Sequence, residues 1–341
     1  MNIPITQSKA WAQLQDDLGE KYFFRQADGY QYLAILKQTP AGNYLYCPYG
    51  PAAEDGASFK RAIKSLHALA SGQRAIFIRV EPTDAKMVNH LPDTAKKSQD
   101  LNPKETWILD LSGSEAELKD KLPSRLLRYY KSATKKGITI EKSHRSEDIK
   151  YLLDLQRALA KEKGINTFSE HYLQTELKQP FATLYLVKLK NGTWTGDAPG
   201  GGPPLSVREV GEEKARQDPP RGYSAVPAEK IVAAGLVFDD NTTRYNLQGA
   251  QSDEGRKLHA TGILTIQLIL DAHAQGQKLF DFWGVAPEGA PSTHPWAGFT
   301  NFKKTFAGYQ ENHAGTYDIV LKPAKYKLYQ TTRKLNRLLR K

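Results

Sequence analysis

The sequence predicts an α+β protein built from two similar halves, each with a mixed sheet flanked by helices. The chain has 341 residues, more than one small core needs. Hydrophobic residues make up 40% and aromatic residues 10%, enough for sizeable buried cores. The order strand, strand, helix, strand also occurs in both halves, which favours two related domains.

The first half is expected to form strands before its main helices. Apolar and aromatic runs predict strands near 21–26, 30–37, 43–47, 75–82 and 106–111, with a helix over 58–71. Ser114 and Glu117 form a capping-box pattern, which predicts a helix start. A second helix is expected over 124–136, ending at Gly137.

The second half repeats this alternation around one irregular stretch. Its expected elements are helices over 146–163, 169–178 and 255–275, strands over 182–189, 230–238, 243–250, 278–285 and 313–321, a helix around Lys303, and a terminal helix. Residues 191–228 are rich in Gly and Pro without periodicity, which predicts a disordered hairpin insertion.

The net charge of +11 is concentrated in two segments. Residues 119–142 carry +6 and residues 322–341 carry +8, so the rest of the chain is slightly acidic. Concentrated basic charge favours a polyanionic partner, either RNA or an acidic membrane surface, and the alternative is two solvated helix faces. Within the first segment Arg128, Lys131 and Lys135 form a basic stripe that could follow tRNA phosphates.

Several classes of protein are excluded by what the sequence lacks. No histidine pairs with another His or Cys at metal-ligand spacing, so no metal is expected. There is no Walker loop, GxGxxG fingerprint or GxSxG elbow, and no cofactor is expected. A single cysteine, an N-terminus without a secretion pattern and short apolar runs predict a cytoplasmic protein.

Lys303 is the foremost candidate for catalysis. It shares one helical face with Phe299, Phe302 and Phe306, at spacings i, i+3, i+4 and i+7. An ammonium among aromatic rings is costly unless an anion or a developing negative charge meets it. The alternative is a lysine whose stem packs on the rings while its head reaches water.

The order of strands and helices in the second half resembles that of GNAT acyltransferases. Those enzymes hold the coenzyme A pyrophosphate on a glycine-rich loop before the long helix. The matching place here begins at Gln251 and contains Asp253 and Glu254, which would repel a pyrophosphate. Acyl-CoA chemistry is therefore the weaker alternative.

Five stretches carry a more specific resemblance. They are YLYCPYGP (44–51), TWILDL to KKGITI (106–140), VAAGLVF with TRYNLQGA (232–250), FDFWGV to FKKTFAGY (280–309) and GTYDIVLKPAKYKLY (315–329). In this order and spacing the chain resembles the FemABX family of aminoacyl-tRNA-dependent transferases. The resemblance implies two GNAT-like domains, with the final strand and helix returning to the first. The expected domains are 1–142 with 316–341, and 143–315.

The implied activity is transfer of an amino acid from a charged tRNA to the stem-peptide amine of a peptidoglycan precursor, soluble UDP-MurNAc-pentapeptide or lipid-linked. Lys303 would stabilise the oxyanion, because Phe302 and Lys303 match the F-K segment of the family. The same resemblance puts precursor contacts at Lys37, Arg244 and Tyr245. Trp283 could line the acceptor groove, and Asp110 is a candidate general base only by its position.

Two departures from the family pattern stand out. The chain reads Pro48-Tyr49-Gly50-Pro51 where the family often has Pro-Arg-Gly-Pro, which removes a positive charge. It also has no room for the long helical arm of some members, which makes it similar to the compact FemX-like ones. The basic C-terminal segment could rest on anionic lipid at the inner face of the membrane. A non-catalytic RNA- or membrane-binding protein is the remaining alternative.

Overall fold

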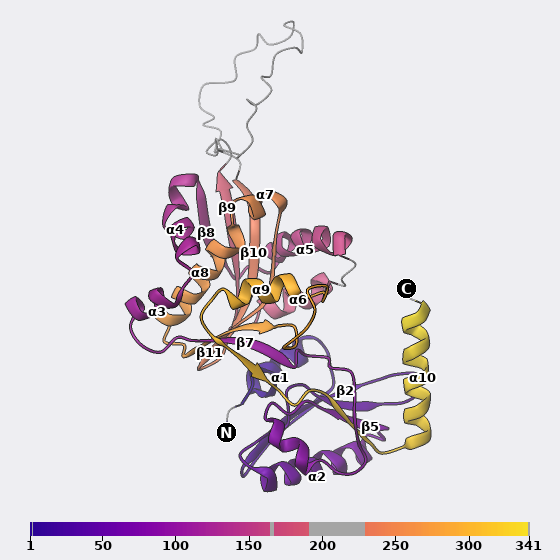
Figure 1. The fold of residues 1–341 in the computed structure, drawn as a ribbon. Coiled ribbons are helices and arrows are strands. Elements are labelled where there is room, and N and C mark those ends of the chain that lie inside the picture. The colour runs from indigo at the N-terminus through magenta and orange to yellow at the C-terminus, as the bar shows by residue number, and fades with distance from the viewer. Residues whose placement is uncertain (2, 164–166, 191–228, 340–341) are drawn as a thin grey trace, which may run out of the picture.

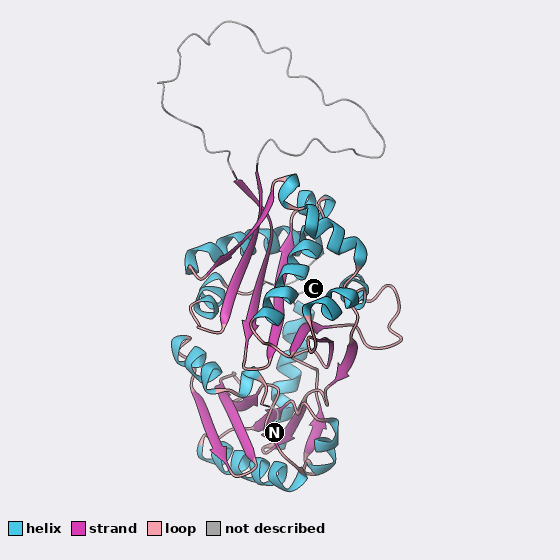
Figure 2. Cartoon of the chain, turned by 90° about the vertical axis from the view of Figure 1, so that its left-hand side faces the viewer, coloured by secondary structure: helices cyan, strands magenta, loops and turns pink. Residues whose placement is uncertain are grey.

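The computed structural model describes residues 1, 3–163, 167–190 and 229–339. These residues form two mixed β-sheets flanked by helices, one above the other in Figure 1 and, turned by 90°, in Figure 2. The predicted α+β class is confirmed. The insertion predicted at 191–228 lies outside the described residues.

The first sheet has the strand order β1-β2-β3-β5-β14-β6, with β4 beside β2. Only β3 and β5 pair in parallel among its neighbours in the described chain. Its strands are β1 (Tyr22–Ala27), β2 (Tyr30–Lys37), β3 (Tyr44–Cys47), β4 (Ala52–Ala53), β5 (Phe77–Val80), β6 (Ala95–Lys97) and β14 (Tyr317–Val320).

Helices α2 (Gly56–Gly72) and α10 (Pro323–Leu339) cover opposite faces of this sheet. Successive side chains of β5 point to opposite faces, as the pleat of a strand requires. Ile78 therefore packs with Phe59 of α2, whereas Phe77 packs with Tyr326 of α10.

The second sheet has the order β13-β7-β12-β11-β10-β9-β8, in which β11 and β12 pair in parallel. Its strands are β7 (Glu105–Asp110), β8 (Ile138–Ser143), β9 (Ala182–Lys190), β10 (Glu229–Asp239), β11 (Thr243–Gln251), β12 (Leu279–Gly284) and β13 (Tyr309–Asn312). All of them come from one continuous stretch of chain, 105–312.

Helices cover both faces of the second sheet (Figure 2). One face packs on α3 (Glu115–Lys121), α4 (Ser124–Ser132) and α8 (Ala260–Ala274), and the other on α5 (Ile149–Lys163) and α6 (Glu170–Leu177). The remaining helices are α1 (Lys9–Asp17), α7 (Asp253–Lys257), α9 (Ala297–Lys304) and the 3-10 turns η1 (Ile5–Gln7), η2 (Ala85–His90), η3 (Thr134–Lys136) and η4 (Ser146–Asp148).

The two halves share a hydrophobic core. Trp11 of α1 and Leu33 of β2 belong to the same buried cluster as Leu184 and Phe238 of the second sheet. Trp11 packs edge-on against Phe238, with ring centroids 6.0 Å apart. This shared core holds the first sheet beside the second and so fixes the junction between them.

Three elements differ from the sequence-based expectations. The strand expected over 313–321 is two strands, because β13 pairs with β7 and β14 pairs with β5 and β6. The helix expected over 255–275 is divided into α7 and α8 at His259, whose φ is 57°. The sheets divide between Lys97 and Glu105 rather than at 142, because β7 pairs with β12.

Candidate active site

Lys303 lies in the last turn of α9, with its ammonium against the end of β12. Its Nζ donates a hydrogen bond to the carbonyl oxygen of Gly284, at 2.6 Å. Burial lowers the pKa of Lys303 to about 8. Phe302 packs on the core next to the buried Phe306, whereas Phe299 is 42% exposed. The aromatic face expected around Lys303 is therefore buried in its second half only.

Asp281, in the middle of β12, is the buried carboxylate whose charge acts on Lys303. Its Oδ1 accepts a hydrogen bond from the backbone N–H of Trp283, at 2.7 Å. Burial raises the pKa of Asp281 to about 7, although the Trp283 N–H and the charge of Lys303 act in the opposite direction. The carboxylate in turn raises the pKa of Lys303 against the effect of burial.

Trp283 lies where the two halves meet. Its φ is 66°, an uncommon value for a non-glycine residue, and the hydrogen bond to Asp281 supports this conformation. Its ring meets Tyr49 edge-on, with centroids 5.5 Å apart, and Tyr245 edge-on at 6.2 Å. Tyr49 belongs to the first half, so these rings connect both sheets beside Asp281.

A buried glutamate supports the first-half side of this junction. Glu81 accepts hydrogen bonds from the hydroxyls of Tyr46 and Thr316, at 2.9 and 2.7 Å, and from the side-chain amide of Asn102, at 2.8 Å. The hydroxyl of Tyr49 donates to the carbonyl oxygen of Pro103, at 2.8 Å. The chain before β7 is thus held next to the Tyr49 loop.

The second sheet opens next to this cluster. Within the described residues the parallel pairing of β11 with β12 ends at Tyr245 and Asp281, although both strands continue beyond these residues. The facing edges past this point have backbone groups that can bind an extended substrate. Lys303 is anchored to Gly284, the last residue of β12, at the edge of this opening.

Arg244 is not available to a substrate in this structure. Its guanidinium is 1% exposed and donates to both carboxylate oxygens of Asp239, at 2.7 and 2.6 Å. It also donates to the hydroxyl of Tyr185, the carbonyl oxygen of Leu268 and the side chain of Gln275. We therefore interpret Arg244 as a structural residue of the hairpin between β10 and β11.

Two other predicted contacts have partners within the protein. Tyr245 lies beside Trp283, but its hydroxyl donates to Asp240, at 2.8 Å. Lys37 pairs with Glu20, at 2.7 Å, and its neighbour across the strands, Tyr44, lies on the α10 side of the first sheet. Lys37 therefore lies away from the Trp283 cluster.

The predicted tRNA-binding residues are on the far side of the second sheet from the first half. Arg128 is on α4, and Lys131 and Lys135 follow at its end, all three exposed. Close by, the ring of Tyr129 stacks on His259 at 4.2 Å, with Arg125 over its face. The stripe therefore forms an exposed basic and aromatic surface.

A large hollow elsewhere contains none of the predicted site residues. It has a volume of about 780 Å³ and lies between α5 and strands β9 to β11. Its charges pair with one another, as Lys188 does with Glu141 and Glu229. In the described part of the chain, no group of three His, Cys, Asp or Glu side chains could hold a metal ion. The Lys303 cluster is therefore the better candidate for chemistry.

Comparison with known proteins supports this choice. The FemAB family model matches residues 215–334, which include Lys303. A search of curated proteins finds no match. Among solved structures, FemX superimposes with a TM-score of 0.74 at 16% identity, covering 95% of this chain and 94% of FemX. The fold is that of FemX. The predicted resemblance is confirmed.

Two proteins named for a lipid product share the FemX-like fold less closely. The C-terminal domain of a putative lysylphosphatidylglycerol synthetase from Agrobacterium fabrum gives a TM-score of 0.57 at 14% identity, covering 96% of this chain and 93% of that domain. L-PGS from Bacillus licheniformis gives 0.53 at 13%, covering 99% of each chain. At these identities the likeness concerns the fold alone.

Sequence reasoning missed Asp281 and the position of Tyr49. Asp281 interrupts the apolar strand FDFWGV, and a carboxylate inside such a strand is a signal of the same kind as Lys303 inside its helix. Tyr49 replaces the arginine of the family pattern, and its ring contacts Trp283. Both signals were in the sequence, but their proximity depends on the fold.

Proposed function

We propose that this protein is an aminoacyltransferase that moves an amino acid from an aminoacyl-tRNA to the stem-peptide amine of a peptidoglycan precursor. The observation that carries the proposal is Lys303, a half-buried ammonium anchored to Gly284 beside the buried Asp281. A FemX-like acyltransferase fold supports the general reaction class, and the amino acid and acceptor are part of the proposal.

The proposed chemistry needs little from the protein except charge and position. The amine nitrogen bonds to the ester carbonyl carbon, the bond from that carbon to the ribose oxygen breaks, and one amine proton ends on the ribose oxygen. The tetrahedral intermediate carries an oxyanion, which the Lys303 ammonium would stabilise in surroundings that partly exclude water. Asp281 would keep Lys303 protonated, because its carboxylate raises the pKa of that lysine.

The acyl-CoA alternative is less well supported. A pyrophosphate would have to approach α7, whose first turn carries Asp253 and Glu254. Both carboxylates pair with nearby cations, Asp253 with Arg256 and Glu254 with Lys230. Acidic groups at a helix start take the place that an anion would need.

We also propose that the two basic segments serve different partners. The stripe of Arg128, Lys131 and Lys135 would follow the tRNA backbone. Helix α10 has exposed leucines, Leu328 and Leu335, on the side away from its packed tyrosines, and lysines flank them. Such a surface suits an anionic bilayer. No helix in the described ranges is long and apolar enough to cross one.

A transfer assay tests the proposed function. Purified protein would receive bulk tRNA charged with radiolabelled Gly, Ala or Ser, and either UDP-MurNAc-pentapeptide or the lipid-linked precursor. Label should reach the precursor only from charged tRNA. Parallel reactions with acetyl-CoA, and with phosphatidylglycerol as acceptor, separate the other reaction classes. Binding of charged and uncharged tRNA without transfer to any acceptor would favour the non-catalytic alternative.

Lys303→Met is the first variant to measure. We expect kcat to fall by about 10²–10³ with little change in precursor binding, because the lost cation acts mainly on the oxyanion. Lys304→Met is the matched control, since Lys304 is exposed and lies over the ring of Trp107. Turnover by Lys303→Met within a few-fold of the parent would remove Lys303 from the mechanism.

A further inference from the structure

Trp296, at the start of α9, is an exposed aromatic ring beside the carbonyl group that anchors Lys303. The side chain is 41% exposed. A Cβ placed on Gly284 would lie 3.2 Å from the Trp296 ring and 2.7 Å from Pro103, so the ring is next to Gly284. The carbonyl oxygen of Gly284 accepts the hydrogen bond from Lys303, at 2.6 Å. One glycine therefore separates the ring from the ammonium.

The position of the Trp296 ring is well defined. The backbone N–H of Trp296 donates to Nδ1 of His294, at 3.1 Å, and the two rings meet edge-on with centroids 6.1 Å apart. Trp296 is also the N-cap of α9, so it lies two turns before Lys303 on nearly the same helical face. A large aromatic surface is thus fixed in place and still open to solvent.

The chemistry of the proposed donor says what this surface can bind. In an aminoacyl-tRNA the reacting ester is on the ribose of the terminal, unpaired adenosine. The base is attached to that same ribose, so it must lie close to the ester carbon. Proteins bind unpaired bases chiefly by stacking them on aromatic rings. A donor with its ester at Lys303 needs such a ring about one nucleotide away.

We propose that Trp296 is the stacking platform for the 3′-terminal base of the aminoacyl-tRNA. This inference rests on the proposed function and names the subsite that its donor occupies. The cations of the last turn of α9, Lys303 and Lys304, are on the same helix and complement the phosphates of the strand. Trp296 is a binding residue for the donor, with no role in the bond-forming step.

The test uses an RNA hairpin with a single-stranded 3′ end whose terminal adenine is replaced by 2-aminopurine, a base whose fluorescence is quenched by stacking. We expect the full-length protein to quench it and Trp296→Ala to lose most of that quenching. In the transfer assay Trp296→Ala should raise KM for charged tRNA by about 5- to 150-fold with kcat nearly unchanged. Trp296→Phe should recover much of both effects.

Phe168→Ala is the matched control, because Phe168 is 54% exposed and lies just before α6. Undiminished quenching in Trp296→Ala, or a hairpin that the parent protein does not quench, would overturn the proposal. A raised KM for the precursor instead of the tRNA would overturn it too and give the ring to the acceptor. Quenching that depends on Trp296, without transfer to any acceptor, would reject the proposed function and leave the stacking site.

Discussion

At the scale of single residues, the pairing of Lys303 with Asp281 makes activity depend on pH. The pKa of Lys303 is about 8, so the ammonium loses its proton as pH rises through that value, and kcat should fall with it. Asp281→Asn removes a charge that raises this pKa. The fall in kcat should therefore begin at a lower pH in the variant. Measuring kcat with saturating substrates from about pH 6 to pH 10 tests this.

The comparison of the two proteins separates Lys303 from the substrate amine. Ionisation of the acceptor amine also changes the rate with pH, but Asp281→Asn leaves that amine unaltered. Uncatalysed hydrolysis of the ester at high pH is subtracted with a reaction that lacks protein. A descending limb at the same pH in both proteins would contradict the role given to Asp281.

The residue scale also shows what the sequence could predict about the site. Lys303 was identifiable because its helical spacing put a cation on an apolar face. Arg244 was misinterpreted because its ion pair with Asp239 and its burial under Leu268 depend on tertiary packing. In the printed sequence an arginine in a strand next to a tyrosine has the same pattern whether it faces a substrate or a carboxylate.

At the scale of elements, local signals predicted helix boundaries well. The capping box of Ser114 and Glu117 is present at the start of α3, and Gly137, with φ of 70°, ends the turn after α4. The division of 313–321 between two sheets could not be predicted in this way. It depends on β7 and β5 as partners, which lie far away in the sequence.

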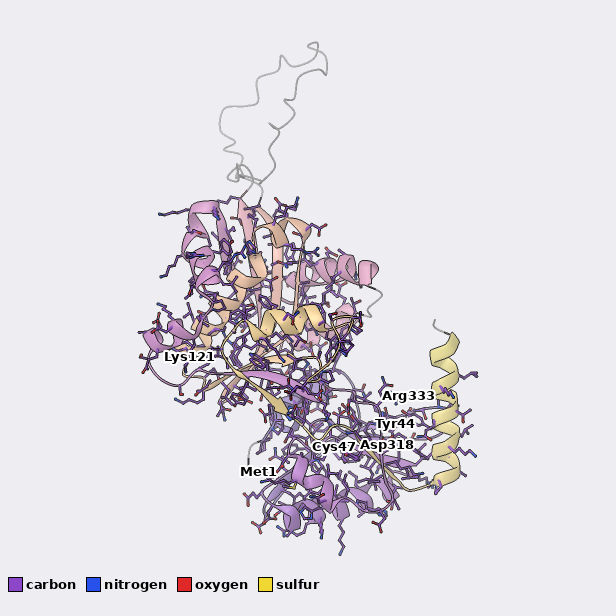
Figure 3. All side chains as sticks on the ribbon, viewed as in Figure 1. Met1, Tyr44, Cys47, Lys121, Asp318 and Arg333 are labelled. Atoms are coloured by element: carbon purple, nitrogen blue, oxygen red, sulfur yellow. The ribbon has the colours of Figure 1, made fainter. Side chains whose placement is uncertain are left out.

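The attachment of α10 and β14 to the first sheet depends on one buried ion pair. Arg79 donates to both carboxylate oxygens of Asp318, at 2.7 and 2.8 Å, and both side chains are 1% exposed. The hydroxyl of Tyr326 on α10 also donates to Asp318, at 2.9 Å. Figure 3 labels Asp318 and Tyr44 in the first sheet and Arg333 on α10.

Asp318→Ala should lower the free energy of unfolding by about 3–5 kcal/mol, because it leaves the Arg79 guanidinium buried without its counter-charge. Urea denaturation followed by circular dichroism measures the change. The double variant Arg79→Met with Asp318→Ala should recover part of the loss, since it removes the unpaired charge. Parent-like stability in the single variant would show that the pair contributes little.

At the scale of the whole molecule, the two basic surfaces lie on different sides. Helix α4 is on the second sheet and α10 stands against the first, at opposite sides of Figure 1. A polyanion bound along α4 would therefore leave α10 exposed. This separation allows each surface to be removed by substitution without altering the other.

For the α4 surface, we expect Arg128→Gln, Lys131→Gln and Lys135→Gln together to weaken tRNA binding. The slope of log K against log[salt] should become shallower by about 2–3, because each lost phosphate contact releases fewer counterions. Filter binding at several salt concentrations gives the slope. The triple variant Lys325→Gln, Lys327→Gln and Lys334→Gln on α10 is the control and should keep the parent slope.

For the α10 surface, the same control triple becomes the test. Its partition onto vesicles rich in phosphatidylglycerol should fall by about 10²-fold, since each lysine near an anionic surface contributes about 1 kcal/mol. Co-sedimentation with these vesicles, and with neutral phosphatidylcholine vesicles, measures the effect. Equal sedimentation of the triple variant and the parent, or binding to neutral vesicles alone, would reject the membrane proposal.

The position of β14 has a consequence for biosynthesis. The strands of the second sheet come from residues 105–312, so that sheet can form as soon as this stretch has left the ribosome. The first sheet needs β14, which lies between β5 and β6, and β14 ends at Val320. We therefore expect the N-terminal strands to wait, with apolar surface exposed, while nearly the whole chain is translated. The half that is made first is thus completed last.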